Sequence, residues 1–430
     1  MKVHRSRSVR RTEVTTDGRN LVSHAGSAML AELADRTGLT RGLSEAMTGC
    51  GISWHTHDPG VVLTHLAVAI ADGADCLCDI DALRSQSELF GEVASVTTAW
   101  RAVKATTAPE LRAIAKAVAS TREVVWRAAP PGDITIDFDA TLLDVHSEKQ
   151  DAAPTYKRGY GFHPLGAWCD TTGEPLALML RPGNAGANDA DDHLELLDQA
   201  IGALPVEYQV GHQPGDEAGL VRHHILVRAD SAGATHGFVR GLTEANIEYS
   251  IGHAVDQAVR EALLLFQEED WREAIEADGT VRDGAQVADL TDLIDLSPWG
   301  EDARLISRRE RPHPGAQLSL FDTSEGFGHT CFITNASALE IDAGALECRH
   351  RGHARVEGRV RCWKDCGLQN LPLASFTQNL AWVATSLIAG ALIAWVQMPC
   401  LDGVLKVAEP KTLRYRPASG WTTRRRGTRG

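Results

Sequence analysis

Apolar residues recur at helical spacing along residues 20–130, and this region is expected to be mostly helical. The segments with the clearest pattern are 26–49, 60–72 and 107–128, the last reading APELRAIAKAVASTREVVWRA. Between them lie acidic and small residues, ADGADCLCDIDAL, and the region contains no Gly-rich phosphate-binding loop. A Pro-Pro-Gly run at 130–132 should end the helical region, because proline interrupts a helix.

The period changes after this run, where apolar and polar residues alternate as they do in β-strands. A strand is expected at 134–147, ITIDFDATLLDVHS, and two more at 161–170 and 174–184, separated by the turn DTTGE. A helix at 191–204, a strand at 223–233, a helix at 235–247 and a strand at 248–254 should follow. This order is that of an RNase H-like core, and the periodicity predicts an α/β fold with a mixed sheet.

Residues 255–340 have another pattern, which predicts an all-β insertion subdomain. We expect a long helix at 255–277 containing Trp271, and then three short alternating runs at 304–310, 316–325 and 328–336. Helices are expected again at 343–366 and 380–398. The predicted organisation is a helical region at 1–130, core segments at 131–254 and 341–400 around the insertion at 255–340, and a basic, disordered tail at 401–430.

The apolar segment 380–398, LAWVATSLIAGALIAWVQM, is close to the ~20 residues that cross a bilayer. Thr385, Ser386 and Gln397 interrupt it, and a helix that is apolar on all sides also suits the centre of a large domain. We therefore expect a buried core helix and no membrane association. The membrane alternative predicts that the chain sediments with membranes.

The composition is that of a globular protein, with 430 residues, 43% hydrophobic and 23% charged. Its nine cysteines, an odd number, show no regular spacing, which favours a reducing compartment. The start MKVHRSRSVRRTEV is basic and lacks the apolar segment of a signal peptide. These features predict a cytoplasmic protein.

The net charge of −14 argues against a nucleic-acid-binding protein, but the charge is unevenly distributed. Residues 1–13 carry five bases and one acid, and residues 340–430 carry 14 bases and seven acids. The acidic excess therefore lies in the middle of the chain. Both basic ends are candidates for contact with phosphates.

Acidic residues on strands are the first candidates for chemistry, because a carboxylate in an apolar setting needs a cation, a donor or a proton. Asp137 and Asp139 share one face of the first strand, since side chains on a strand alternate. Asp230 stands at the carboxyl end of the strand ILVRAD. In α/β folds, sites form at the carboxyl ends of such strands.

Glu357 is the candidate for a third carboxylate, because Mg²⁺ prefers oxygen ligands. The bases around it at helical spacing are Arg355, Arg359, Arg361 and Lys364. A helix with one acid among several bases can hold a metal with the acid and a phosphodiester with the bases. The alternative is an ion pair between Glu357 and Arg361, four residues further on.

A zinc site is the second interpretation of the same segment. Its ligands would come from Cys348, His350, His353, Cys362 and Cys366. Their spacing contains no C-x-x-C pair, so the hard-cation interpretation is preferred. Cys76 and Cys78, with His55 and His57, are interpreted as local structure, since no partner pair would complete a tetrahedral site.

Five blocks of sequence occur in a characteristic order: ITIDFDATLLDVHSEK, GYGFHPLGAW, LRPGNAGANDADDH, ILVRADSAGATH and HARVEGRVRCWKDCGLQNLP. Together they resemble bacterial insertion-sequence transposases with an RNase H-like DDE core, in the branch with a β insertion before the catalytic Glu. The resemblance runs from about residue 20 to residue 415.

The resemblance implies a role for each carboxylate. The family's first Asp stands in an Asp-x-Thr setting, which matches Asp139 better than Asp137. Its second Asp follows an apolar strand, as Asp230 does, and its Glu precedes a Lys by seven residues, as Glu357 precedes Lys364. Together the three matching carboxylates would hold two Mg²⁺ ions, or Mn²⁺. Water would then free a 3′ hydroxyl at the element end, and this hydroxyl would attack target DNA.

The resemblance also implies DNA contacts. Lys364 would bind phosphates, together with Arg355, Arg359 and Arg361. His350 and His353 occupy positions where the family has Tyr and Arg, and a histidine can still donate to phosphate. The helical region would bind the terminal inverted repeats of double-stranded DNA, and a homodimer would bring two ends together. A stand-alone nuclease of the same fold and an inactive DNA-binding remnant are the alternatives.

Family members continue beyond the LRYR block with further helix. Here the sequence continues as RPASGWTTRRRGTRG, a Gly- and Arg-rich tail that is not expected to fold.

Overall fold

A nine-stranded mixed sheet forms the centre of the computed structural model, which describes residues 26–51, 56–145, 148–312 and 319–415. In spatial order the strands are β6 (Glu174–Met179), β5 (Leu165–Cys169), β1 (Ile134–Ala140), β7 (Ile225–Ala229), β8 (Glu248–His253), β12 (Gly328–Thr334), β11 (Arg304–Glu310), β10 (Val281–Asp289) and β9 (Arg272–Ile275). β1 pairs antiparallel with β5 and parallel with β7, which pairs parallel with β8. The predicted α/β fold with an RNase H-like core is therefore confirmed.

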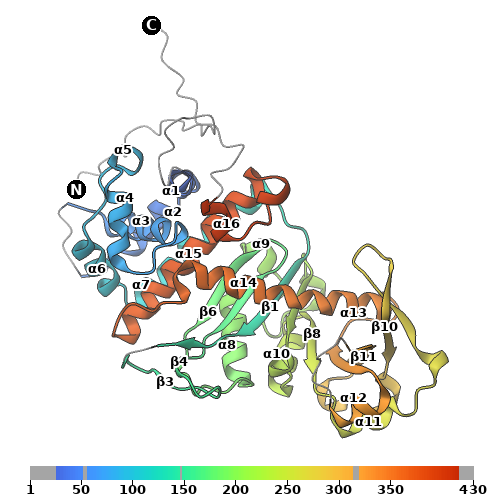
Figure 1. Cartoon of the computed structure of the whole chain (residues 1–430). Helices are drawn as coiled ribbons and strands as arrows, with labels where there is room; N and C mark the ends of the chain where they lie inside the picture. The colour runs from blue at the N-terminus through green and yellow to red at the C-terminus, as the bar shows by residue number, and fades with distance from the viewer. Residues whose placement is uncertain (1–25, 52–55, 146–147, 313–318, 416–430) are drawn as a thin grey trace.

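Helices cover both faces of the core strands (Figure 1). On one face lie α8 (Ala190–Gly202) and α10 (His236–Glu244), and the nearby α9 (Val206–Gln209) follows α8. Phe138 points to this face, where its ring contacts Phe238 of α10 at 5.5 Å between centroids. The other face carries α13 (Ala343–Arg351) and α14 (Arg355–Trp363), which correspond to the helix predicted at 343–366. Because strand side chains alternate, Asp137 and Asp139 face α13 and α14.

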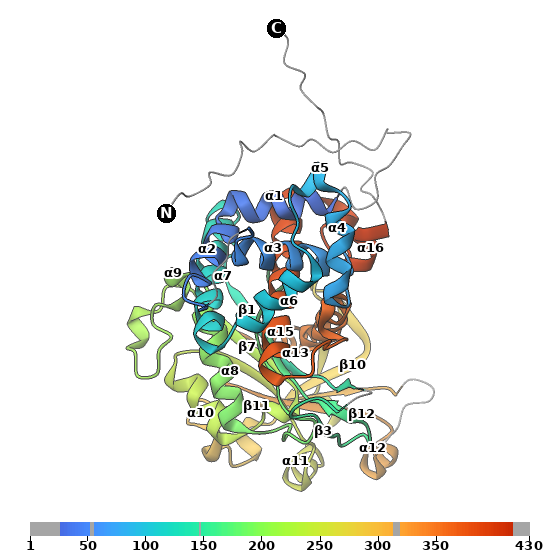
Figure 2. The same cartoon turned by 90° about the vertical axis from the view of Figure 1, so that its left-hand side faces the viewer.

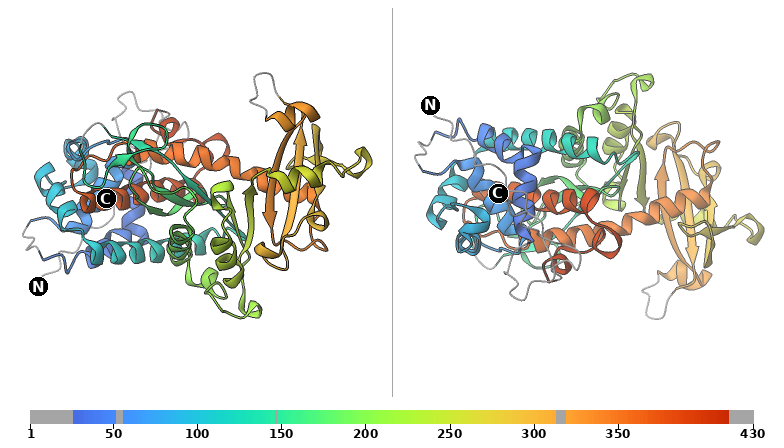
Figure 3. Two further views of the ribbon diagram at one scale, coloured as in Figure 1. Left: turned by 90° about the horizontal axis from the view of Figure 1, so that it is seen from below. Right: turned by 90° about the horizontal axis from the view of Figure 1, so that it is seen from above.

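The insertion continues the core sheet. β12 pairs antiparallel with β8, from Cys331 opposite His253 to Thr334 opposite Ser250, and β11, β10 and β9 follow outward. Figure 3 shows the insertion at one end of the molecule, the N-terminal helices at the other, and the helix of α13 and α14 running between them. The pairing covers the edge of β8, which would otherwise expose unpaired backbone groups.

Two predictions within the insertion are wrong. The helix expected at 255–277 ends early, as α11 (Gln257–Leu263), and Trp271 precedes strand β9. Pairing of β9 with β10 and the Arg309 guanidinium 4.3 Å from the Trp271 ring centroid outweigh the local helical pattern. The described part of the run 316–325 is a helix, α12 (Leu320–Glu325), because Ser319 caps its first turn.

The N-terminal region is helical, as predicted, and lies above the sheet in Figure 2. Its elements are α1 (Ser27–Thr37), α2 (Leu39–Ala46), α3 (Pro59–Ala71), the short turn Leu77–Ile80, α4 (Asp81–Arg84), α5 (Ser87–Phe90), α6 (Val96–Ala105) and α7 (Ala108–Ala128). Gly38, at φ 85°, divides the segment 26–49, where helical spacing was predicted, into α1 and α2. Left-handed backbone of this kind favours glycine and ends a helix.

The apolar segment 380–398 lies within α15 (Phe376–Cys400), which packs against α3, α7 and β6. Among the described residues, α15 is the one helix long and apolar enough to cross a membrane, and 78% of its most apolar window is buried in the protein. The α3 segment and the following helix pass the same test only as a pair, and they are bent by 101°. The burial of α15 agrees with the predicted core helix.

Glu174 joins the helical region to the sheet at the start of β6. Its buried carboxylate accepts hydrogen bonds from Arg122 Nε at 2.7 Å and from the indole nitrogens of Trp126 and Trp395 at 2.6 Å each. Arg122 and Trp126 belong to α7 and Trp395 to α15. A buried charge is tolerated when it is paired and hydrogen-bonded in this way.

The segment 401–415 is ordered, which corrects the prediction of a disordered tail over these residues. α16 (Pro410–Tyr415) packs back onto the core, where Arg414 donates to the carbonyls of Ala71 and Asp365 at 2.8 and 2.9 Å. The rest of the predicted tail, 416–430, and the basic start, 1–13, lie outside the described residues.

Candidate active site

The register of β1 and β7 gives the two acids of β1 different neighbours in the β7 segment. Asp137 lies directly opposite Arg228, and Phe138 opposite Ala229, so that Asp139 and Asp230 follow side by side where the two parallel strands end. The first pair carries opposite charges and the second carries like charges. A like-charge pair at neighbouring strand ends is unfavourable unless a proton or a cation compensates it.

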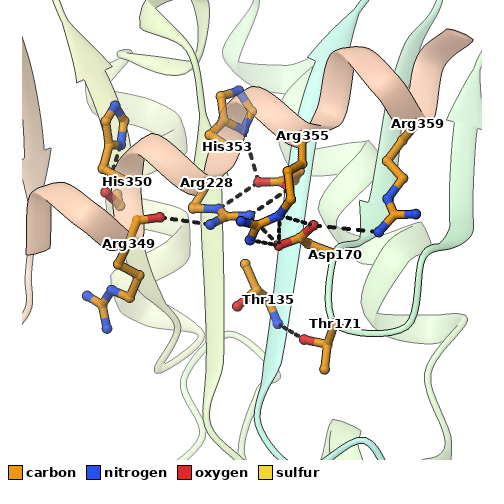
Figure 4. A network of polar contacts seen from close by, with 11 residues as sticks. Thr135, Asp170, Thr171, Arg228, Arg349, His350, His353, Arg355 and Arg359 are labelled. Atoms are coloured by element: carbon orange, nitrogen blue, oxygen red, sulfur yellow. Dashed lines mark hydrogen bonds and ion pairs between the residues drawn. The ribbon is translucent and has the colours of Figure 1, made fainter. Parts of the chain in front are cut away.

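Asp137 is an internal ion-pair partner. Its side chain is fully buried, Arg228 donates to its two oxygens at 2.7 and 2.8 Å, and His353 Nδ1 lies 2.9 Å from Oδ1. Arg228 also donates to Asp170 Oδ2 and to the carbonyl of Arg349, at 2.8 Å each. Figure 4 shows Arg228 in this network. With both oxygens engaged inside the fold, Asp137 is poorly placed to bind a metal, and this favours Asp139 as the first ligand.

Asp139 lies within electrostatic reach of the other two predicted carboxylates. Burial, with the Asp230 and Glu357 carboxylates, raises the pKa of Asp139 to about 6, and His353 acts against this rise. Asp230 and Glu357 are exposed, Asp230 directly after β7 and Glu357 in the first turn of α14. The fold therefore brings together three carboxylates from segments that are far apart in the sequence.

The three carboxylates do not form a closed set of ligands. Within the described part of the chain, the one group of three or more possible ligands whose atoms all lie within 4.8 Å of one another is Cys76, Cys78 and Asp79. An open arrangement still suits Mg²⁺, which is usually held by one or two carboxylates while water and substrate phosphates complete its shell. The oxygen-only donor set and the uncompensated negative charge fit a hard cation.

The zinc interpretation is not supported by the geometry. His353 contacts Asp137, and His350 contacts Ser250 Oγ at 2.9 Å while stacking on Phe332 with 4.2 Å between ring centroids. The close approach of Cys76 and Cys78, whose Sγ atoms lie 2.6 Å apart, was not predicted from the sequence. Their C-x-C spacing was the available signal.

Lys364 is the predicted phosphate contact that lies beside the carboxylates. Its Nζ donates to the carbonyl of Leu142 at 3.1 Å, and burial lowers its pKa while Asp144 and Asp139 act to raise it. Lys364 follows α14 and Leu142 follows β1, so one hydrogen bond connects the Glu357 helix to the end of the Asp139 strand.

The three arginines of α14, predicted as phosphate contacts, have acidic partners within the protein. Arg355 pairs with Asp170, Arg359 Nη2 lies 3.9 Å from Asp170 Oδ1, and Arg361 pairs with Glu409 (Figure 4 for the first two). The three side chains line a cavity of about 830 Å³ between α14, α15 and the segment before α16.

His350 and His353 likewise point into the protein. The contacts of His350 with Ser250 and Phe332 bury its ring, and burial lowers its pKa to about 3, so that the neutral form prevails. His353 Nδ1 contacts the buried Asp137 carboxylate. Neither geometry supports the predicted contact with DNA phosphate.

Asp139→Asn is expected to raise the melting temperature of the metal-free protein at pH 8. The folded-state pKa of Asp139, about 6, lies above the ordinary value of 3.8, so ionisation costs stability that increases as the pH rises from 3.8 to 6 and then stays constant. The amide avoids this cost, and the advantage of the variant should shrink as the pH falls below about 6. Thermal melts at pH 8 and pH 5 check the expectation.

Added Mn²⁺ is the control for this prediction. It should stabilise the wild type at pH 8 and leave Asp139→Asn almost unchanged, because a cation that binds only the folded state shifts the unfolding equilibrium. A variant that melts below the wild type at pH 8 without metal contradicts the electrostatic assignment.

The sheet order, with acids at the ends of β1 and β7 and a third on the covering helix, defines an RNase H-like protein of the DDE type. The chain belongs to the family described as transposase DDE domain group 1, whose model matches residues 4–417. The predicted resemblance to DDE transposases is thereby confirmed.

Among solved structures, the chain is similar to a piggyBac transposase in a cryo-EM structure of its synaptic complex with hairpin DNA. The TM-score is 0.42 and the identity 11%, over 94% of this chain and 82% of that chain. No curated protein matches the sequence.

Proposed function

We propose that this transposase cleaves DNA at the ends of an insertion sequence and joins them to target DNA by in-line phosphoryl transfer. The observation that carries the proposal is the like-charge pair of Asp139 and Asp230 at adjacent strand ends, with Glu357 of α14 within electrostatic reach of Asp139. These carboxylates would hold Mg²⁺ or Mn²⁺. The bound cations would activate the attacking oxygen and stabilise the leaving oxygen.

The residues of the chain position the DNA for this reaction. Asp139 and Asp230 project from a sheet whose register is held from within by the Asp137–Arg228 pair. Lys364, anchored on the Leu142 carbonyl, presents a cation next to Asp139 that can bind a phosphate close to the reacting bond. No side-chain nucleophile is required, because water and then the freed 3′ hydroxyl supply the attacking oxygen.

We also propose an assembly of two chains on DNA. The helical region at 1–130 would recognise the terminal inverted repeats, and two copies of the chain would hold the two ends of one element. The reaction would take place in the cytoplasm, on double-stranded DNA.

A strand-transfer assay tests the proposed function. The substrate is a labelled duplex that carries the terminal repeat flanking this gene, with the 3′ hydroxyl already exposed, and the target is supercoiled plasmid. In the presence of Mg²⁺ or Mn²⁺ we expect joined products that do not form in EDTA.

The other outcomes identify the alternatives. Cleavage of an uncut end without joining indicates a stand-alone nuclease. Binding of the duplex with neither cleavage nor joining indicates an inactive DNA-binding remnant.

A further inference from the structure

A small second sheet stands beside the carboxylates. It consists of β2 (Leu143–Asp144), β4 (Tyr160–Phe162) and β3 (Ala153–Pro154), with β4 in the middle. β3 and β4 form a hairpin that projects from the lower edge of the core in Figure 1. We call residues 155–160, TYKRGY, the hairpin tip.

The tip exposes two cations and two aromatic rings. The side chains of Tyr156 and Tyr160 are 69% and 41% exposed. Lys157 and Arg158 are exposed as well, and neither forms an ion pair with another described residue. The Lys157 ammonium lies 5.7 Å from the centroid of the Tyr156 ring. Exposed rings beside exposed cations on one turn form a surface that can bind a ligand with both negative charge and aromatic faces.

The tip borders the site through Asp144 and Lys364. Its Gly159 packs so closely on β2 that an added Cβ would lie 2.3 Å from Asp144 Oδ1. The Asp144 carboxylate acts to raise the pKa of Lys364, and the Lys157 ammonium acts to lower it. The two lysines therefore lie within electrostatic reach of each other. The tip and Lys364 therefore form a positive border beside Asp139.

The turn is rigid. Thr155 accepts a backbone hydrogen bond from Arg158 at 3.0 Å, its own amide donates to the Gly159 carbonyl at 2.9 Å, and its hydroxyl accepts from the Gly159 amide at 3.0 Å. Arg158 has a φ of 65°, a left-handed conformation that the closed turn maintains. A pre-formed turn presents its side chains without the entropy cost of ordering a loop.

We propose that the hairpin tip is a DNA contact next to the scissile bond, with Lys157 and Arg158 on backbone phosphates and Tyr156 stacked on a base that has left the duplex. This inference rests on the proposed function and adds a contact to those predicted for the α14 arginines, of which Arg355 and Arg361 pair with Asp170 and Glu409. Like charges concentrated at Lys157, Arg158 and Lys364 repel one another, and a phosphodiester relieves that repulsion. Aromatic rings beside cations are the usual surface for unpaired bases.

The salt dependence of DNA binding tests the phosphate contacts. The variant is Lys157→Gln with Arg158→Asn, since asparagine removes the charge and tolerates the left-handed backbone. The probe is a fluorescent duplex of the flanking terminal repeat. If both phosphate contacts are lost, the slope of log K against log salt should fall by about 1.8, and affinity near 0.1 M salt by roughly tenfold or more.

The matched control removes two exposed positive charges elsewhere, with Arg222→Gln and Arg240→Gln. Arg240 lies on α10, on the face of the sheet opposite α14, and Arg222 precedes β7. The control should keep the wild-type slope. A tip variant whose slope equals that of the control overturns the proposal.

Photocross-linking tests the aromatic contact independently of activity. Terminal-repeat DNA carrying 5-iododeoxyuridine at successive positions around the cleavage site should cross-link to the peptide containing Tyr156. The Tyr156→Ala variant should lose this cross-link and keep its fold by circular dichroism. Cross-linking of the wild type only at distant positions rejects the contact. A wild type that binds and cross-links but never cleaves disproves the proposed function and leaves the contact intact.

Discussion

Asp230→Asn or Glu357→Gln should lower the rate of DNA cleavage by roughly a thousandfold or more, with end binding almost unchanged. Each substitution removes one charge and one oxygen ligand from the set of three carboxylates, which lies where β1 and β7 end and α14 passes over them. The loss falls on the chemical step, because these groups act on charge that develops in the transition state. Quantitative cleavage of a labelled repeat duplex, with binding measured separately in Ca²⁺, checks it.

The control is Asp133→Asn, because Asp133 is an exposed acid directly before the first residue of β1 and thus at the end of the strand away from Asp139. It should cleave like the wild type. Asp139→Asn should behave like the other two site variants, whereas Asp137→Asn should lose activity only with a loss of stability, because it leaves the buried Arg228 without its full partner. Wild-type cleavage by any of the three site variants rejects the assignment of the carboxylates.

Arg122→Met should lower the free energy of unfolding by about 3–5 kcal/mol. The substitution keeps most of the side-chain volume but leaves the Glu174 carboxylate buried without its cation, with only the two indole donors of Trp126 and Trp395. The Glu174 carboxylate bonds both α7 and α15 to the start of β6. Urea denaturation followed by tryptophan fluorescence measures the loss.

Two variants separate the buried charge from a general effect on α7. Arg127→Met on the same helix removes an exposed pair with Glu123 and should cost less than about 1 kcal/mol. Combining Arg122→Met with Glu174→Gln should recover part of the stability, because the amide oxygen still accepts from an indole and carries no charge. A double variant no more stable than Arg122→Met contradicts the electrostatic explanation.

Asp137 and Asp139 of β1 could be predicted as candidate ligands from the sequence, but the sequence pattern could not distinguish between them. Alternation alone placed Asp137 and Asp139 on one face and left both as candidates. The register with β7 separates them, since it sets Asp137 against a base and Asp139 against an acid. Cross-strand neighbours are determined by pairing between distant segments, which no local pattern contains.

For the basic helix α14, the sequence did not show which bases have acidic partners. Helical spacing correctly placed four bases around Glu357, but it did not show which of them have acidic partners elsewhere. Arg355 and Arg361 meet Asp170 and Glu409, which come from other segments, and Lys364 alone lies beside Asp139. The exposed cations of the hairpin tip, which had no place in the predicted site, are further candidates for the proposed phosphate contact.

The sequence by itself determined the order of the core elements, the helical N-terminal region, the buried apolar helix and the membership of the DDE family, because periodicity and motif spacing are local properties. Only the tertiary structure decided that the insertion extends the core sheet, that the α-helix does not continue over residues 264–277 and that Asp137 is an internal partner. These features depend on which distant segments pair and which charges are buried together. Such contacts contribute free energy only once the chain has folded, so the local pattern cannot reveal them.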